Sequence, residues 1–198
     1  MLGYDRAVVT LSGGQRMEYR LSDTTYTMHR VFCATPGDLE PERRAFYDVI
    51  GEVNEVEGMP RNFLFVPVSI VPHMLNKLMF QPMVESNVRD CKFFVQVLQD
   101  TWGPPARNFE PEYHLACRLR ADPSFPMAGI AVFFKAADGL SVEPKIVQLK
   151  SSVKSQEDPV PYHCATVDEF KTLLRSQLSD WLKTICLTER LKVPLGRF

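Results

Sequence analysis

Four short apolar runs recur along the chain, and polar or turn-forming residues follow each of them. The runs are HRVFCAT (29–35), FLFVPVSIV (63–71), CKFFVQVLQ (91–99) and GIAVFFKA (129–136). Nearly continuous apolar runs of this length are typical of strands that are covered on both faces. Pro67 removes a backbone N–H donor from the second run, which favours a sheet edge or a bulge for that strand.

Helical spacing of apolar residues appears between and after these runs. Residues 39–56 and residues 167–185 place apolar side chains mainly on one helical face. Residues 72–90 indicate a loop and a helix, and residues 112–120 indicate a further helix. Because strands alternate with helices, we predict an α/β fold with an open, mainly parallel sheet flanked by helices.

Capping residues mark the starts of two of these helices. Asp38 precedes the first helix and is placed to accept hydrogen bonds from its free backbone N–H groups. Thr166 precedes the last helix, and Glu169 stands at the position of a capping box. These residues predict where the two helices begin.

The first residues of the chain have a different pattern. Residues 7–21 contain two short alternating segments around SGGQ (12–15), which predicts a β-hairpin with glycines in its turn. We therefore expect residues 1–28 to form an N-terminal extension and residues 29–198 to form one α/β domain.

Composition narrows the class of protein. Hydrophobic residues make up 45% of the 198 residues, which is enough for an ordinary globular core. Lys and Arg total 23 against 24 Asp and Glu, so no overall charge favours nucleic acid or an anionic membrane as a partner. The five cysteines are scattered and form no C-x-x-C pair, so we expect neither a disulfide framework nor a metal site. No apolar stretch has the length of a signal or membrane segment, and we expect a soluble, cytoplasmic protein.

The predicted topology points to one end of the sheet. Ligands of open parallel sheets bind beyond the carboxyl ends of the strands. The loop after the first run (35–38) and the loop after the third run (100–112) must both face that crevice. The second of these loops leads into FEPEYHLACRLR (109–120), which has two glutamates at the start of a helix.

Four segments of the chain match motifs of a known family. FCATPGDLEPER (32–43) resembles V-F-[IV]-S-S-T-x-x-D-L-x-x-E-R, the start of a TIR-like domain family of unknown function that often precedes STAND-type NTPases. NVRDCKFFV (87–95) resembles that family's E-I-x-x-C-D-I-F-[IV], WG (102–103) its [RY]-[YW]-G, and FEPEYHLA (109–116) its T-E-x-E-Y-x-x-A. The matches span about residues 30–135 in the family's order.

The resemblance implies a flavodoxin-like fold similar to those of TIR domains and nucleoside 2-deoxyribosyltransferases. Catalytic members of these groups carry a glutamate at the start of the helix after an inner strand, and Glu112, four residues before Ala116, matches it. The resemblance therefore implies cleavage of an N-glycosidic bond, with NAD as substrate rather than cofactor. It also implies self-association, so we expect a homo-oligomer.

The same resemblance assigns a set of candidate site residues. Glu112 would be the catalytic carboxylate. Thr35 and Asp38 would line the ribose or phosphate side, Trp102 would cover the base, and Glu110 lies beside them. Because two positions on a helix differ by about 200° of rotation, Glu110 and Glu112 cannot both face the crevice.

Simpler roles stay open for these residues. Acidic side chains are common at helix N-termini without any further role, and Asp38 can act as a cap alone. Trp102 can belong to the core, and Cys33 can be a packed thiol rather than a nucleophile. His114 has no partner at metal-ligand spacing, which favours a surface or structural role.

Departures from the family pattern favour a different class of function. Cys33 and Ala34 replace the paired serines of the first loop, so two hydroxyl groups are missing there. Phe109 and Lys92 replace a threonine and an aspartate. The rival hypothesis is a non-catalytic module that uses the same fold to self-associate or to dock a partner.

Overall fold

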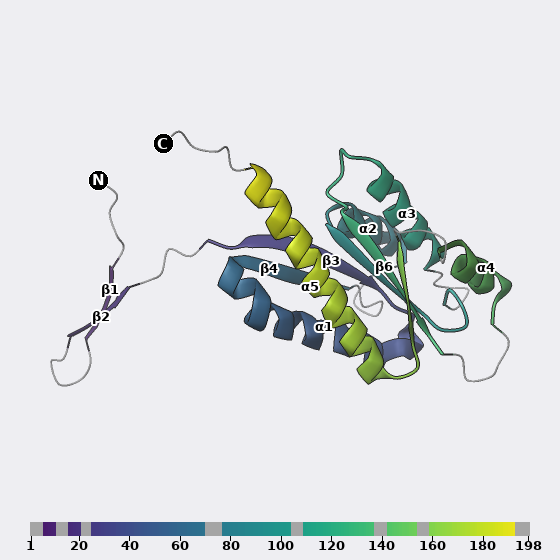
Figure 1. Ribbon diagram of the computed structural model, residues 1–198, viewed down its shortest axis with the longest axis horizontal. Coiled ribbons are helices and arrows are strands. Elements are labelled where there is room, and N and C mark those ends of the chain that lie inside the picture. Colours follow the sequence, from purple (N-terminus) through teal and green to yellow (C-terminus); the bar gives the residue numbers. More distant parts are fainter. Residues whose placement is uncertain are drawn as a thin grey trace.

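A five-stranded parallel sheet forms the centre of the molecule (Figure 1). The computed structural model describes residues 6–10, 16–20, 25–69, 77–103, 109–136, 142–153 and 159–192. The strands of the sheet are β3 (Thr27–Ala34), β4 (Phe63–Val68), β5 (Phe93–Leu98), β6 (Gly129–Lys135) and β7 (Val160–Cys164). They run in the order β4-β3-β5-β6-β7, and every neighbouring pair is parallel.

Helices cover both faces of this sheet. They are α1 (Glu40–Val53), α2 (Lys77–Arg89), α3 (Glu110–Ala121), α4 (Pro144–Val153) and α5 (Val167–Lys192). Helices α1 and α5 pack on one face, and α2, α3 and α4 pack on the other (Figure 1). The predicted α/β architecture is therefore confirmed.

Side chains of alternating direction along the strands build one hydrophobic cluster on each face. In β5, Phe93, Val95 and Val97 join the α1/α5 cluster, whereas Phe94 and Leu98 join the α2/α3/α4 cluster. All six residues of β5 are buried, as expected for an inner strand with helices on both sides.

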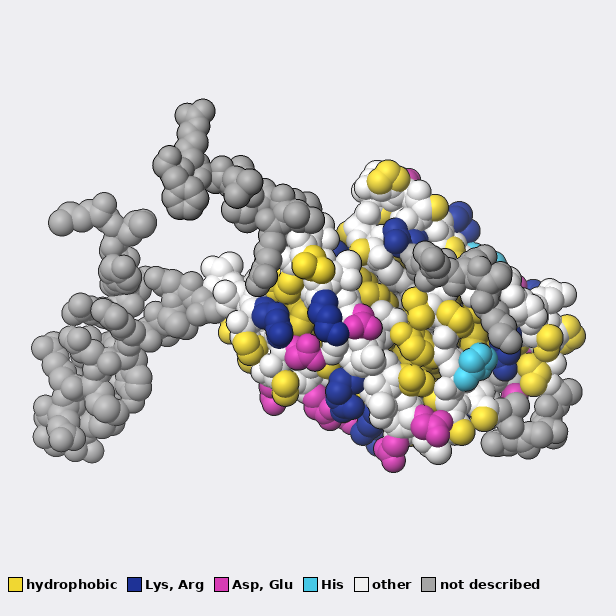
Figure 2. All heavy atoms as spheres, viewed as in Figure 1, with side chains coloured by type: hydrophobic (Ala, Val, Ile, Leu, Met, Phe, Trp, Pro, Cys, Tyr) yellow, Lys and Arg dark blue, Asp and Glu magenta, His cyan; other side chains and the backbone are white. Residues whose placement is uncertain are grey.

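Charged side chains connect α1 to α5 at the surface. Arg175 pairs with Glu52, and Lys171 Nζ lies 3.6 Å from Asp48 Oδ2. Figure 2 shows basic and acidic side chains interspersed over this part of the molecule. Such exposed pairs contribute little to stability, so burial between the two helices is the main contact.

The order of the strands defines where a ligand crevice would form. Numbered by themselves in chain order, the five strands are arranged 2-1-3-4-5, which is the flavodoxin-like order. In this arrangement the chain leaves β3 and β5 toward opposite faces, to α1 and to α3. The topological switch point therefore lies between the carboxyl ends of β3 and β5.

Strand β4 is the edge strand that Pro67 predicted. Its outer side is partly closed by a side chain: Asn54, in the single π-helical turn Asn54–Gly58, makes two hydrogen bonds to the backbone of Phe65. Asn54 Nδ2 donates to the Phe65 carbonyl at 2.9 Å, and the Phe65 N–H donates to Asn54 Oδ1 at 2.8 Å. The side-chain amide of Asn54 thus pairs one backbone N–H and one backbone carbonyl that have no neighbouring strand on this side of the edge strand.

The N-terminal segment contains a second, two-stranded sheet. Strands β1 (Arg6–Thr10) and β2 (Arg16–Arg20) pair antiparallel, as the hairpin prediction requires. The predicted SGGQ turn (12–15) lies outside the described residues. The division into an extension and one domain stays a prediction.

The two capping predictions have different outcomes. The Glu169 N–H donates to Thr166 Oγ1 at 3.1 Å, and Glu169 Oε2 accepts from the Ala165 N–H at 2.6 Å, so α5 begins with the expected cap. The prediction for Asp38 is wrong. A 3₁₀ turn (Gly37–Leu39) precedes α1, and neither it nor α1 has a side-chain cap hydrogen bond. Asp38 lies inside that turn and is exposed.

Candidate functional site

The carboxyl end of the sheet gathers the residues that the sequence singled out. Thr35 follows the last residue of β3, and Trp102 lies in the loop after β5. Glu112 lies in the first turn of α3, which that loop leads into. Together with Asp38, these residues all lie beyond the carboxyl ends of β3 and β5, on the two sides of the switch point.

Glu112 is a buried carboxylate at a helix N-terminus. It is the third residue of α3, and only 3% of its surface is exposed. Its neighbours Tyr113 and Ala116 are buried in the α2/α3/α4 cluster. The partial positive charge at the start of α3 attracts a carboxylate there, and burial strengthens any interaction that it makes.

Glu110 has different surroundings from Glu112. Glu110 Oε2 lies 2.7 Å from Lys145 Nζ, and Glu110 Oε1 lies 3.9 Å from His114 Nε2. The first contact joins α3 to α4 and raises the pKa of Lys145 through a hydrogen bond and charge attraction. The two glutamates therefore point to different environments, as their helical spacing predicts.

The loop that follows β3 contains one buried hydroxyl group, which lies next to the apolar or weakly polar side chains of Cys33 and Ala34. Thr35 is 4% exposed, and its Oγ1 lies 2.9 Å from Cys33 Sγ. Burial raises the pKa of Cys33 to about 12, so the thiol stays protonated at neutral pH. Cys33 is thus a packed thiol and not an activated nucleophile. Ala34 beside it is also buried.

Trp102 is packed into the core beside this site. It is 3% exposed, and its ring lies 5.6 Å from the Tyr113 ring and 6.5 Å from the His114 ring. Its backbone N–H donates to Glu143 Oε2 at 3.2 Å, and its carbonyl accepts from the Phe109 N–H at 2.9 Å. These contacts hold the loop between β5 and α3. They favour a packing role for Trp102 over the predicted role of covering a base.

Gln96 is a polar residue at this end that the sequence prediction missed. It is fully buried in β5, and its Nε2 donates to the Ala34 carbonyl at 3.0 Å, which links β5 to β3 at the switch point. Its Oε1 has no hydrogen-bond partner within the described residues. The signal was present as the single amide in the middle of the apolar segment FFVQVL.

A second missed feature is a buried ion pair on the α1 side. Glu42, in the first turn of α1, is completely buried, and its Oε1 lies 2.8 Å from Lys135 Nζ at the end of β6. Within the described residues, neither carboxylate oxygen of Glu42 accepts a hydrogen bond, so the contact with Lys135 is an ion pair. Glu42 belongs to the D-L-x-x-E-R match, but only the fold brings Lys135 to it.

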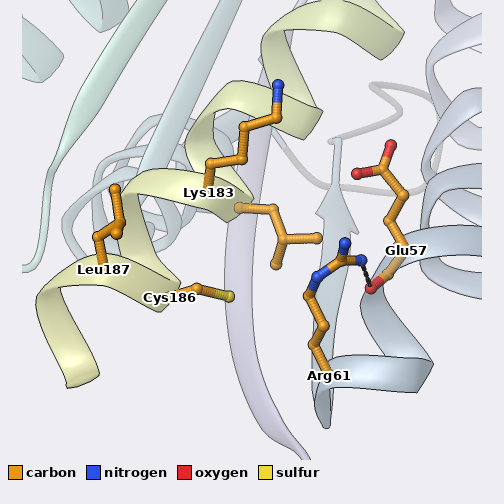
Figure 3. Close-up of a pocket in the computed structure, with 6 residues that line it drawn as sticks. Glu57, Arg61, Lys183, Cys186 and Leu187 are labelled. Carbon is orange, nitrogen blue, oxygen red and sulfur yellow. Dashed lines mark hydrogen bonds between the residues drawn. The ribbon is translucent and has the colours of Figure 1, made fainter.

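Cavities lined by described residues lie elsewhere. The one in Figure 3 has a volume of about 300 Å³ and lies between α5 and the turns before β4, with Arg61 and Lys183 in its wall. This is the amino end of β4, opposite the switch point. No cavity described from the resolved ranges of the chain includes Thr35, Trp102 or Glu112 in its lining.

Other classes of site have no support in the part of the chain that the structure describes. No group of three or more His, Cys, Asp or Glu side chains there could hold a metal ion. All five cysteines are free. No helix within the described ranges is long and apolar enough to cross a membrane.

Comparison with known proteins adds no family assignment. No protein-family model matches the chain, and no curated protein matches its sequence. The fold and the arrangement at the carboxyl end of the sheet are therefore the observations on which function must be argued.

Proposed function

We propose that the chain binds a nucleotide at the carboxyl ends of β3 and β5 and cleaves the N-glycosidic bond of NAD. The observation that carries this proposal is the burial of Glu112 in the first turn of α3, beside the switch point of a flavodoxin-like sheet. Open α/β sheets bind their ligands at this place. The resemblance to TIR-like proteins supplies the substrate class.

The chemistry needs little more than one well-placed carboxylate. Breaking the bond between ribose and the positively charged nicotinamide builds oxocarbenium character on the sugar, and nicotinamide leaves as a neutral molecule without a general acid. Water adds to the anomeric carbon and gives ADP-ribose and a proton. A carboxylate in a site of low dielectric stabilises the developing positive charge, and this is the role proposed for Glu112.

Buried polar atoms near the switch point support a binding role for this end of the sheet. Gln96 Oε1 and Trp102 Nε1 are both buried and have no hydrogen-bond partner within the described residues. Most buried polar groups in folded proteins are paired, so each exception calls for a reason. A ligand that donates to Gln96 or accepts from Trp102 would supply one.

The experiment that tests this proposal is incubation of the purified protein with NAD, followed by chromatography of the products. Release of nicotinamide together with ADP-ribose supports the reaction. Intact NAD after incubation at several protein concentrations would reject it. The proposed setting is signalling or defence in the cytoplasm, where NAD is available.

A second candidate is a non-catalytic interaction module, and two observations favour it. Cys33 and Ala34 are buried at the end of β3, where the family pattern has hydroxyl groups, and the Trp102 ring is packed rather than open. Under this hypothesis the fold acts by self-association or by docking a partner. Light scattering across a range of concentrations tests it: a strict monomer with full NAD cleavage would exclude this candidate.

A further inference from the structure

A separate cavity lies over the carboxyl ends of β6 and β7. It has a volume of about 270 Å³, and its wall includes Phe134 and Lys135 from β6, His163 and Cys164 from β7, and Lys150 from α4. Three consecutive elements of the chain thus contribute to one hollow. It lies beyond the outer pair of strands, away from the switch point between β3 and β5.

Basic side chains surround an aromatic ring in this cavity. The Nζ of Lys150 lies 5.3 Å from the centre of the Phe134 ring, and the His163 ring stacks on the same ring at 5.5 Å. Lys150 has no carboxylate within ion-pair distance among the described residues. Within the described residues, the Phe134 ring is therefore the contact that holds this ammonium group near the cavity.

Lys135 is fixed on the other side of the cavity. Its Nζ is anchored by the buried Glu42 at 2.8 Å, while 24% of its side chain stays exposed. An ammonium group has three donors, so the ion pair with Glu42 leaves donors for a ligand. Glu42 thereby acts as a positioning residue for Lys135.

The acidic groups nearby are already engaged. Glu42 is completely buried behind Lys135, and Glu169 accepts the backbone N–H of Ala165 at 2.6 Å. No Asp or Glu belongs to the described lining of the cavity. Among the described residues of the lining, Lys150 therefore brings a positive charge without an ion-pair partner, whereas Glu42 balances the charge of Lys135.

We propose that this cavity binds a phosphate-bearing small molecule through Lys135, Lys150 and His163. Ammonium groups bind phosphate oxygens as strong, charge-assisted donors. The volume lies just below the range of about 300 to 1,000 Å³ for drug-sized ligands, which suits a phosphate or pyrophosphate group better than a large ligand. The site does not depend on Glu112 or on cleavage of NAD.

Calorimetric titration of the whole chain with inorganic pyrophosphate at low salt tests the site. We expect saturable binding of about one pyrophosphate per chain. Lys150→Met should weaken it about tenfold, because one charge-assisted contact is lost. Lys183→Met is the matched control, since it removes the same charge from an exposed lysine on α5 and should leave binding unchanged.

Further arms of the experiment distinguish the source of the phosphate and guard against loss of folding. Tighter binding of ADP than of pyrophosphate would identify a nucleotide as the ligand, and equal binding would identify the phosphates alone. His163→Gln serves as a second variant and should also weaken binding. No saturable binding by the parent protein, or equal weakening by Lys150→Met and Lys183→Met, would overturn the proposal, whatever the result with NAD.

Discussion

His29 should make the stability of the fold depend on pH. The residue lies in β3 and is 8% exposed, and its ring stacks on Phe63 with 5.6 Å between ring centres. Its Nε2 has no hydrogen-bond partner within the described residues. Burial, together with the positive charge of Lys92, lowers the pKa of His29 from 6.5 to about 4.

The sign of the effect follows from that lowered pKa. Below pH 6.5 the unfolded chain binds a proton at this histidine, whereas the folded chain does not do so until about pH 4. His29 therefore does not lower the free energy of unfolding above about pH 6.5. The free energy of unfolding decreases as the pH falls from 6.5 toward about 4. Between pH 7.5 and pH 5 the loss from this one group is about 2 kcal/mol.

His29→Phe isolates the contribution of this group. Phenylalanine keeps an aromatic ring beside Phe63 but cannot take up a proton, so the variant should lose about 2 kcal/mol less than the parent protein over the same pH range. Urea denaturation of both proteins at pH 7.5 and pH 5 gives the comparison, in which all other titrating groups cancel. Equal losses in parent and variant would refute the reasoning.

Two further predictions concern contacts described above. Lys135→Met should lower the free energy of unfolding by about 3 kcal/mol, because it leaves the Glu42 carboxylate buried without its partner. Lys171→Met, which breaks only a surface pair, should cost less than about 0.5 kcal/mol in the same urea titration; similar losses in the two variants would contradict the account. Asn54→Ala should cost about 2 kcal/mol, since two hydrogen bonds to the edge strand are lost, and an unchanged denaturation midpoint would show that water replaces them.

The inner strands could be predicted from the sequence because burial on both faces removes polar positions. The described residues of β5 and β6 are buried almost throughout, and their apolar runs are therefore distinct from the rest of the chain. Helix α5 was equally predictable, since its apolar residues recur at helical spacing behind the Thr166 cap. The proline in β4 correctly indicated an edge strand.

Elements that are only half buried could not be predicted in this way. Strand β7 has the sequence VPYHC, and Cys164 is its only fully buried residue, so it shows neither a continuous run nor a clear alternation. Helix α4 is short and buries three residues, Ile146, Leu149 and Val153. The sequence predicted no element at either place.

Features of the candidate site that depend on local helical spacing could be predicted from the sequence. Features that depend on tertiary packing could not. Helical geometry predicted that Glu110 and Glu112 would diverge, and they have different surroundings. The Glu42–Lys135 pair joins α1 to β6, so it depends on packing that no local pattern shows. Asp38 failed as a cap because a 3₁₀ turn starts before α1 and takes Asp38 into its interior.

The central claim is that the Glu112 carboxylate stabilises the transition state of NAD cleavage, and one comparison tests it most directly. Nicotinamide release is measured for the parent protein, for Glu112→Gln and for Glu110→Gln, with thermal melting as the check of folding. Glu112→Gln keeps the size of the side chain but removes its charge, so the rate should fall roughly a hundredfold, equivalent to about 3 kcal/mol. Glu110→Gln should stay close to the parent rate, because Glu110 pairs with Lys145 on α4. Equal rates for Glu112→Gln and the parent protein would contradict the mechanism, and no release by the parent protein would favour the interaction module.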